Sequence, residues 1–152
     1  MPNYIKPTFT LTANKNSVTS GTKGPLSVAL SLTASGNLAV DNVRSEILTV
    51  PWTADGDAAT LLIDGSAYTP GTGGTNGGYV FMKNTTTTAG EFIYIGVHPP
   101  GLEDIDDASD DHRFMTLKPN EWAFFPFDYT QDISVESSAA RQVLEYWIFD
   151  RG

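Results

Sequence analysis

At 152 residues, with 40% hydrophobic and 11% aromatic residues, the chain is long enough for one domain with a packed core and too apolar for a disordered protein. Its net charge of −9, from 9 basic and 18 acidic residues, and its lack of clustered Lys and Arg argue against binding of naked nucleic acid through phosphate contacts. The absence of cysteine excludes disulfides and thiolate metal sites.

The N-terminal sequence Met-Pro-Asn-Tyr-Ile-Lys lacks a basic segment followed by an apolar one. No apolar run approaches the roughly 18 residues of a membrane span. We therefore expect a soluble protein that is made in the cytoplasm, is not exported by the general secretory route and does not act at a membrane.

Residues 3–13 alternate loosely between apolar and polar side chains, and Pro7 interrupts them. Because proline has no backbone N–H to donate to a neighbouring strand, this segment is predicted to be an edge strand or an extended arm. The polar residues 14–24 are predicted to connect this arm, so that 1–24 precedes a β-sandwich domain at 25–152. The apolar arm residues that we expect to bind a partner are Tyr4, Ile5, Phe9 and Leu11.

The rest of the chain carries short apolar or alternating segments separated by Gly, Pro, Asn, Asp and Ser, and it has no convincing helix pattern. Asp64-Gly65 is a hairpin-type turn signal. Strands at about 10-residue spacing predict an all-β fold, an antiparallel β-sandwich or jelly roll with an extended N-terminal arm. The predicted strands are 25–33, 38–43, 45–52, 59–63, 79–83, 91–97, 112–117, 122–127, 132–136 and 143–149.

A tight turn and an aromatic strand lie at 118–127. Pro119 presets φ near −65°, and Asn120 is among the few non-glycine residues that tolerate the positive φ of a type II turn. The strand after this turn is the densest aromatic segment of the chain. We predict that it forms the centre of the core, and that it is an interface if it instead faces outward.

Six of the acids lie in one loop, between Glu103 and Asp111, and the remaining 9 basic and 12 acidic residues leave a charge of −3. This loop is predicted to face solvent or a partner, because its spacing misses the pattern of a calcium loop. Weak metal candidates are Asp104, Asp106, Asp107 and Asp110. Two histidines, His98 and His112, flank the loop and give a weak signal for a metal site.

The three tryptophans suggest a possible sugar-binding surface. Trp122 and Trp147 lie in strongly apolar strands, so core positions are predicted for both, and Trp52 at a strand end is the best candidate for an exposed glycan platform. Asn84-Thr85-Thr86 matches a glycosylation sequon, a pattern that is frequent by chance. No nucleophile elbow, cofactor loop or pair of glycosidase-like carboxylates is found, so enzyme activity is not expected.

From Gly78 onward the chain resembles small β-sandwich virion proteins of tailed phages, of the marine and cyanobacterial podovirus type. The shared pattern is a strand followed by Asn-Thr, a strand ending in Gly, a Leu-x-Pro-Gly-Glu turn, an aromatic-Pro strand and a Leu-Glu-Tyr strand. Asn120 replaces the usual glycine of the turn. The resembling segments are 80–85, 93–97, 114–121 and 144–149.

This resemblance implies a non-enzymatic capsid decoration or cement protein without cofactors. Such a protein is assembled in the host cytoplasm, is found in the virion, binds the major capsid protein, and forms trimers or dimers. The alternative is a head-fibre or tail-associated module that binds a carbohydrate or receptor. A cupin-like enzyme is the third hypothesis, and it requires His98 and His112 to hold a metal.

Overall fold

The computed structural model describes residues 3–12, 31–35, 38–52, 59–68, 77–97, 112–139 and 142–151. These residues form eleven strands and one 3₁₀ helix. The chain divides into two compact units, 1–40 and 41–152, which are considered separately. The predicted boundary between residues 24 and 25 lies outside the described residues, so the division into an arm and a sandwich stays a prediction.

The N-terminal unit consists of two antiparallel strand pairs. Strand β1 (Asn3–Ile5) pairs with the first residues of β4 (Leu38–Val50), and Tyr4 lies opposite Ala39. Strand β2 (Thr8–Thr12) pairs with β3 (Ser31–Ser35). As the sequence predicts, the chain is extended here and the strands are interrupted at Pro7.

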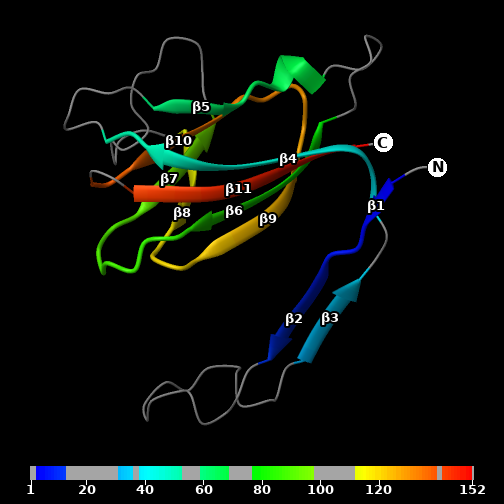
Figure 1. The fold of residues 1–152 in the computed structure, drawn as a ribbon, viewed down its shortest axis with the longest axis horizontal. Helices are drawn as coiled ribbons and strands as arrows, with labels where there is room; N and C mark the ends of the chain where they lie inside the picture. The colour runs from blue at the N-terminus through cyan, green and yellow to red at the C-terminus, as the bar shows by residue number, and fades with distance from the viewer. Residues whose placement is uncertain are drawn as a thin grey trace. The chain divides into compact units, whose positions relative to one another are not determined.

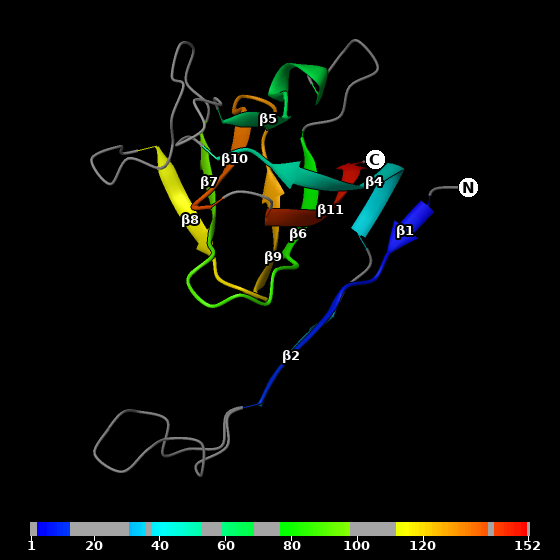
Figure 2. The same ribbon diagram turned by 60° about the vertical axis from the view of Figure 1, so that its left-hand side comes forward.

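The second unit contains two four-stranded sheets, which form the two layers visible in Figures 1 and 2. The first sheet has the order β1-β4-β11-β6-β9, and the second unit contributes four of these strands: β4, β11 (Gln142–Arg151), β6 (Gly78–Asn84) and β9 (Trp122–Phe127). The second sheet has the order β5-β10-β7-β8, with β5 (Thr60–Ile63), β10 (Ile133–Ser137), β7 (Ile93–Val97) and β8 (Arg113–Leu117). The all-β sandwich prediction is confirmed.

The core lies between these sheets. Along β6, buried and half-buried residues alternate from Gly78 to Asn84, so that Val80 and Met82 are fully buried. The alternation follows from the two-residue period of a strand, which sends successive side chains to opposite faces. The other sheet contributes Ile93, Ile95 and Val135, all fully buried. Burial of such aliphatic side chains stabilises the sandwich by roughly 1.5–3 kcal/mol each.

The turn at 118–121 has the predicted geometry. Asn120 has φ of 63°, and the Glu121 N–H donates to the Lys118 carbonyl at 2.9 Å. The Glu121 carboxylate also accepts a hydrogen bond from the Lys118 N–H at 2.9 Å. This turn joins β8 of one sheet to β9 of the other, and it therefore closes one side of the sandwich.

Two local predictions are wrong. The segments predicted as separate strands at 38–43 and 45–52 form the single strand β4 up to Val50. Asp64-Gly65 does not form a hairpin turn, because it opens the 3₁₀ helix η4 (Gly65–Tyr68), in which Ala67 N–H donates to the Asp64 carbonyl. A Cβ atom at Gly65 would lie 2.5 Å from the Tyr129 carbonyl oxygen, so close packing explains this glycine. None of the described residues belongs to a helix long and apolar enough to cross a membrane.

Candidate functional site

The outer side of the first sheet carries a set of aromatic side chains that we call the aromatic face. The residues of β6, β9 and β11 that alternate with the buried ones point away from the core. Three neighbouring strands thus place six rings on one surface. These rings belong to Tyr79, Phe81, Trp122, Phe124, Trp147 and Phe149.

Strand register aligns these side chains in rows across β11, β6 and β9. Both ladders are antiparallel and continuous over this region. Each row therefore brings side chains of three strands within contact distance of one another. The rows are Glu145–Lys83–Trp122, Trp147–Phe81–Phe124 and Phe149–Tyr79–Pro126.

The rings contact one another between rows. Their centroids are 6.0 Å apart for Tyr79 and Phe124 and 6.1 Å apart for Phe81 and Trp122. Phe149 lies 6.3 Å from the rings of both Phe124 and Trp147. These separations fall in the range in which aromatic pairs stabilise each other. Four rings thus form one connected chain, in the order Tyr79, Phe124, Phe149 and Trp147. Phe81 and Trp122 form a contacting pair, and strand register places Phe81 between Trp147 and Phe124.

Arg151 adds a positive charge at one end of this cluster. Its guanidinium carbon lies 5.0 Å from the centre of the Tyr79 ring, a distance suited to a cation–π contact. The opposite end carries Glu145 and Lys83, which lie directly across from each other on β11 and β6. Charged groups thus flank the aromatic residues at both ends.

The face is open to solvent at its two tryptophans. Trp122 is 50% exposed and Trp147 is 42% exposed, whereas Phe124 is half-buried. The predicted core positions of Trp122 and Trp147 are therefore wrong. Both strands carry aromatic residues on their two faces, and a period of two does not indicate which face meets the other sheet. The aromatic density of 122–127 was the sequence signal that pointed to this surface.

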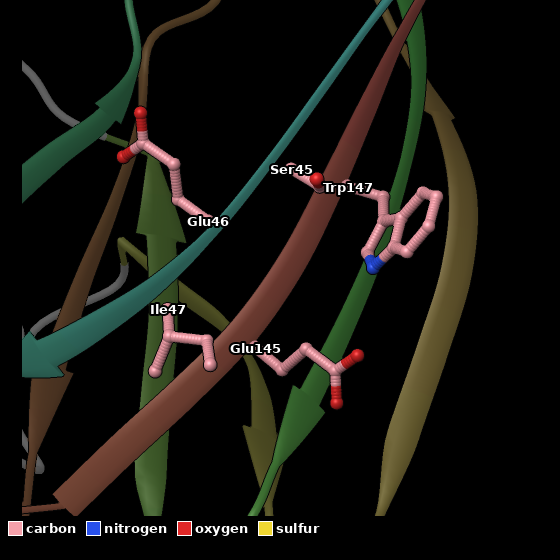
Figure 3. Close-up of a pocket in the computed structure, with 5 residues that line it drawn as sticks. All are labelled: Ser45, Glu46, Ile47, Glu145 and Trp147. Carbon is pink, nitrogen blue, oxygen red and sulfur yellow. The ribbon is translucent and has the colours of Figure 1, made fainter.

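An open cleft borders the aromatic face on the side of β4. It is lined by Ser45, Glu46, Ile47, Glu145 and Trp147. Figure 3 shows the side chains of Glu145 and Trp147 on the same side of β11, whereas that of Glu46 points away from them. The cleft thus combines an indole ring, a carboxylate and a hydroxyl group on one surface.

Behind this cleft, a polar cluster lies on the inner side of β4 and β11. Tyr146 donates a hydrogen bond of 2.7 Å to the Glu46 carboxylate. Arg44 donates to the Tyr68 hydroxyl, and its guanidinium lies over the Tyr68 ring. Burial, and then the hydrogen bond and negative charge of Glu46, raise the pKa of Tyr146 from 10.0 to about 12.

The residues predicted to bind a partner lie in the N-terminal unit. Tyr4 is 58% exposed and Ile5 is half-buried. Phe9 and Leu11 lie on β2, opposite Ala34 and Leu32 of β3. Their role in partner binding stays a prediction.

Trp52, the predicted glycan platform, is half-buried and forms an isolated parallel bridge with Ser137. It does not belong to the aromatic face, whose members lie on β6, β9 and β11. Of the three tryptophans, the two that were predicted to lie in the core are more exposed than the one predicted to bind sugar. Glycan binding by Trp52 stays a prediction.

The predicted metal candidates Asp104, Asp106, Asp107 and Asp110 lie outside the described residues, as does His98. His112 is half-buried at the start of β8. Within the part of the chain that the structure describes, no group of three or more His, Cys, Asp or Glu residues could hold a metal ion.

The sequon asparagine has a structural role. Asn84 is fully buried, and its side-chain amide donates hydrogen bonds to the Glu91 and Leu117 carbonyls at 3.2 and 3.1 Å. Its side-chain oxygen accepts a hydrogen bond from the Thr86 N–H at 3.0 Å. A fully buried amide that is bonded in this way is inaccessible to a glycosylating enzyme in the folded chain.

Three comparisons with known proteins gave no match: no family model matches the chain, and neither a curated protein nor a solved structure is significantly similar to it.

Proposed function

We propose that this chain is a non-enzymatic structural protein of a phage particle, a decoration or cement protein that stabilises the capsid through homo-oligomers. The observation that carries the assembly part of this proposal is the aromatic face. The assignment to a phage particle rests on the resemblance of 80–85, 93–97, 114–121 and 144–149 to virion proteins.

The composition of the face supports a role in assembly. Soluble monomers seldom expose large contiguous apolar patches, and such patches commonly mark sites of protein association. Protein interfaces are enriched in Trp, Tyr, Phe and Arg at their centre and have a polar rim. The aromatic face has this arrangement, with Arg151 at one end and Glu145 and Lys83 at the other.

The N-terminal unit supplies the second proposed contact, with the major capsid protein. Extended segments bind neighbouring proteins by adding a strand to an open sheet edge. In the described residues, β1 and β2 are short extended strands, and the exposed ring of Tyr4 is available to such a partner. The residues proposed to contact the shell are Tyr4, Ile5, Phe9 and Leu11.

Purified particles of the phage that encodes this chain provide the test. The proposal predicts that the chain co-purifies with the particles through density-gradient centrifugation, in a fixed ratio to the major capsid protein, and is seen on the shell by electron microscopy. Particles lacking the chain are expected to lose DNA at a lower temperature. Absence of the chain from purified particles would contradict the proposed function.

The cleft beside Trp147 favours carbohydrate binding as a second candidate function. An indole ring can pack against the apolar face of a pyranose, and the carboxylate of Glu145 can accept hydrogen bonds from sugar hydroxyls. A glycan array tests this candidate with Trp147→Ala and Trp52→Ala as a matched pair. Binding that is lost only in Trp147→Ala supports the cleft, and wild-type protein that binds no glycan removes the candidate.

A further inference from the structure

We propose that the occupant of the aromatic face is the same face of a second copy of this chain, held by a two-fold axis that lies in the interface and runs perpendicular to the strands. In this arrangement Glu145 of each copy meets Arg151 of the other. The inference rests on the assembly role proposed above and specifies its partner and its geometry.

The outward-facing residues of β11 carry a charge pattern that suits this symmetry. Glu145 and Arg151 lie three residues before and three residues after Ile148, so each charge lies about 10 Å from this midpoint along the strand. The outward residues between them are Trp147 and Phe149. The pattern is thus acidic, aromatic, aromatic, basic, and reversing the strand exchanges the two charges.

A two-fold axis perpendicular to the strands, at the level of Ile148, stacks β11 on β11 of the second copy in the opposite direction. Glu145 then faces Arg151 at both ends of the strand, which gives two opposite-charge pairs. Trp147 faces Phe149 at the centre. On β6 the same operation places Phe81 opposite Tyr79, since these residues lie in the same rows as Trp147 and Phe149.

The other two-fold arrangement of the same two faces has its axis parallel to the strands, along β6. It places Lys83 opposite Lys83 of the second copy, and it places Glu145 opposite Trp122. Two like charges would then face each other at the end of the aromatic face, which disfavours this arrangement. Charge complementarity therefore selects the perpendicular axis.

The expected interface also agrees with how binding energy is distributed in protein complexes. Large aromatic residues at the centre, shielded from water by a polar rim, contribute most of the affinity. In the proposed dimer the row Trp147–Phe81–Phe124 packs against the row Phe149–Tyr79–Pro126 at the centre. The Glu145–Arg151 pairs lie at the rim, where they fix orientation more than affinity.

Two charge reversals test this geometry in the full-length chain by sedimentation equilibrium at low ionic strength. In a dimer of Glu145→Arg, arginine faces arginine at both ends of the strand. In a dimer of Arg151→Glu, glutamate faces glutamate at both ends. Each variant alone is expected to have a dimer dissociation constant raised by about tenfold or more. An equimolar mixture of the two variants is expected to recover wild-type association as a heterodimer, because both of its charge pairs are complementary.

Two controls keep the result interpretable. The double variant Glu145→Arg/Arg151→Glu retains complementary pairs and is expected to dimerise like the wild type. Thr116→Arg changes the charge on the outer side of the other sheet and should leave association unchanged. Circular dichroism melting of each variant shows whether it is folded.

Recovery of association in the mixture, together with dimerisation of the double variant, is the result expected. A wild-type dimer whose folded charge variants associate no better when mixed would overturn this geometry and leave the virion assignment untouched. A wild-type chain that is monomeric at every concentration would overturn self-association through the face. The presence or absence of the chain in purified particles tests the virion assignment separately.

Discussion

At the level of single residues, Tyr146 connects strand β11 to strand β4. Its ring lies on the inner side of β11, and its hydroxyl donates to Glu46 at 2.7 Å. Because burial and Glu46 both favour the protonated phenol, the pKa of Tyr146 rises to about 12. The neighbouring residues Glu145 and Trp147 point outward, so this hydrogen bond is expected to hold β11 against β4 beneath the cleft.

The raised pKa predicts a stability change at high pH. A group whose folded pKa exceeds its unfolded value contributes its full stabilisation below the unfolded pKa, here 10.0, and loses it as the pH rises through about 12. We expect the wild type to lose on the order of 1 kcal/mol of unfolding free energy between pH 10 and 12 from this group, because solvent screens the partly exposed hydroxyl and its exposed partner Glu46.

Urea unfolding of the wild type and of Tyr146→Phe across this pH range measures the effect. The Phe variant lacks the ionisable hydroxyl, so its stability should fall less steeply over the same interval. If the unfolding free energies of the two proteins fall equally between pH 10 and 12, the raised pKa of Tyr146 is contradicted.

Asn84 is a fully buried polar residue beside the turn at 118–121, and its backbone carbonyl accepts a hydrogen bond from the Asn120 N–H at 3.0 Å. Its side-chain amide donates hydrogen bonds to the carbonyls of Glu91 and Leu117, and its side-chain oxygen accepts a hydrogen bond from the Thr86 N–H. We expect Asn84→Ala to reduce the free energy of unfolding by roughly 2–4 kcal/mol, since it leaves buried groups without partners. Asn120→Gly is the matched control and should be nearly neutral, because φ of 63° suits glycine. Equal effects of the two changes in urea unfolding would contradict this account.

At the scale of the strand, the six residues of β9 point alternately into the core and onto the aromatic face. Phe127 is 6% exposed and meets Tyr68 edge-to-face at 5.0 Å, whereas Phe124 points outward and is half-buried. We expect Phe127→Ala to lower the free energy of unfolding by roughly 3–5 kcal/mol and Phe124→Ala to lower it by about 1 kcal/mol. Urea unfolding at low protein concentration, where monomers dominate, gives both values. A larger loss for Phe124→Ala than for Phe127→Ala would place the face inside the core.

Most strands of the second unit were predictable from sequence because local signals define them. Apolar segments bounded by turn residues located β6 and β7, and the Lys-Pro-Asn-Glu segment fixed the turn between β8 and β9 through the backbone preferences of Pro119 and Asn120. The 3₁₀ helix η4 was not predicted, because glycine is required at position 65 by close packing against the Tyr129 carbonyl and not by a hairpin turn. No local pattern carries that information.

The candidate site was less predictable for a physical reason. Strands β9 and β11 carry aromatic residues on both sides, as is typical of strands that meet a second sheet on one side and a partner on the other. From sequence alone, Trp122 and Trp147 look like core residues, and Trp52 looks like the exposed one. Only the pairing of β6 with β9 and β11 brings the six rings together.

At the scale of the whole molecule, the proposed function requires that the aromatic face be covered in the assembled state. The N-terminal unit is proposed to contact the shell, and the aromatic face is proposed to join copies of the chain. Replacing Phe81 and Trp147 together with threonine removes two of the three rings in the row Trp147–Phe81–Phe124 and keeps good strand propensity on β6 and β11. The core residues between the sheets are unchanged in this variant.

The mass of the protein in solution, measured by sedimentation equilibrium over a wide range of concentrations, tests the central claim most directly. We predict that the wild-type chain forms a homo-oligomer and that Phe81→Thr/Trp147→Thr is a folded monomer under the same conditions. A wild-type monomer, or a folded variant that keeps the oligomeric mass, would contradict the claim that the aromatic face joins copies of this protein.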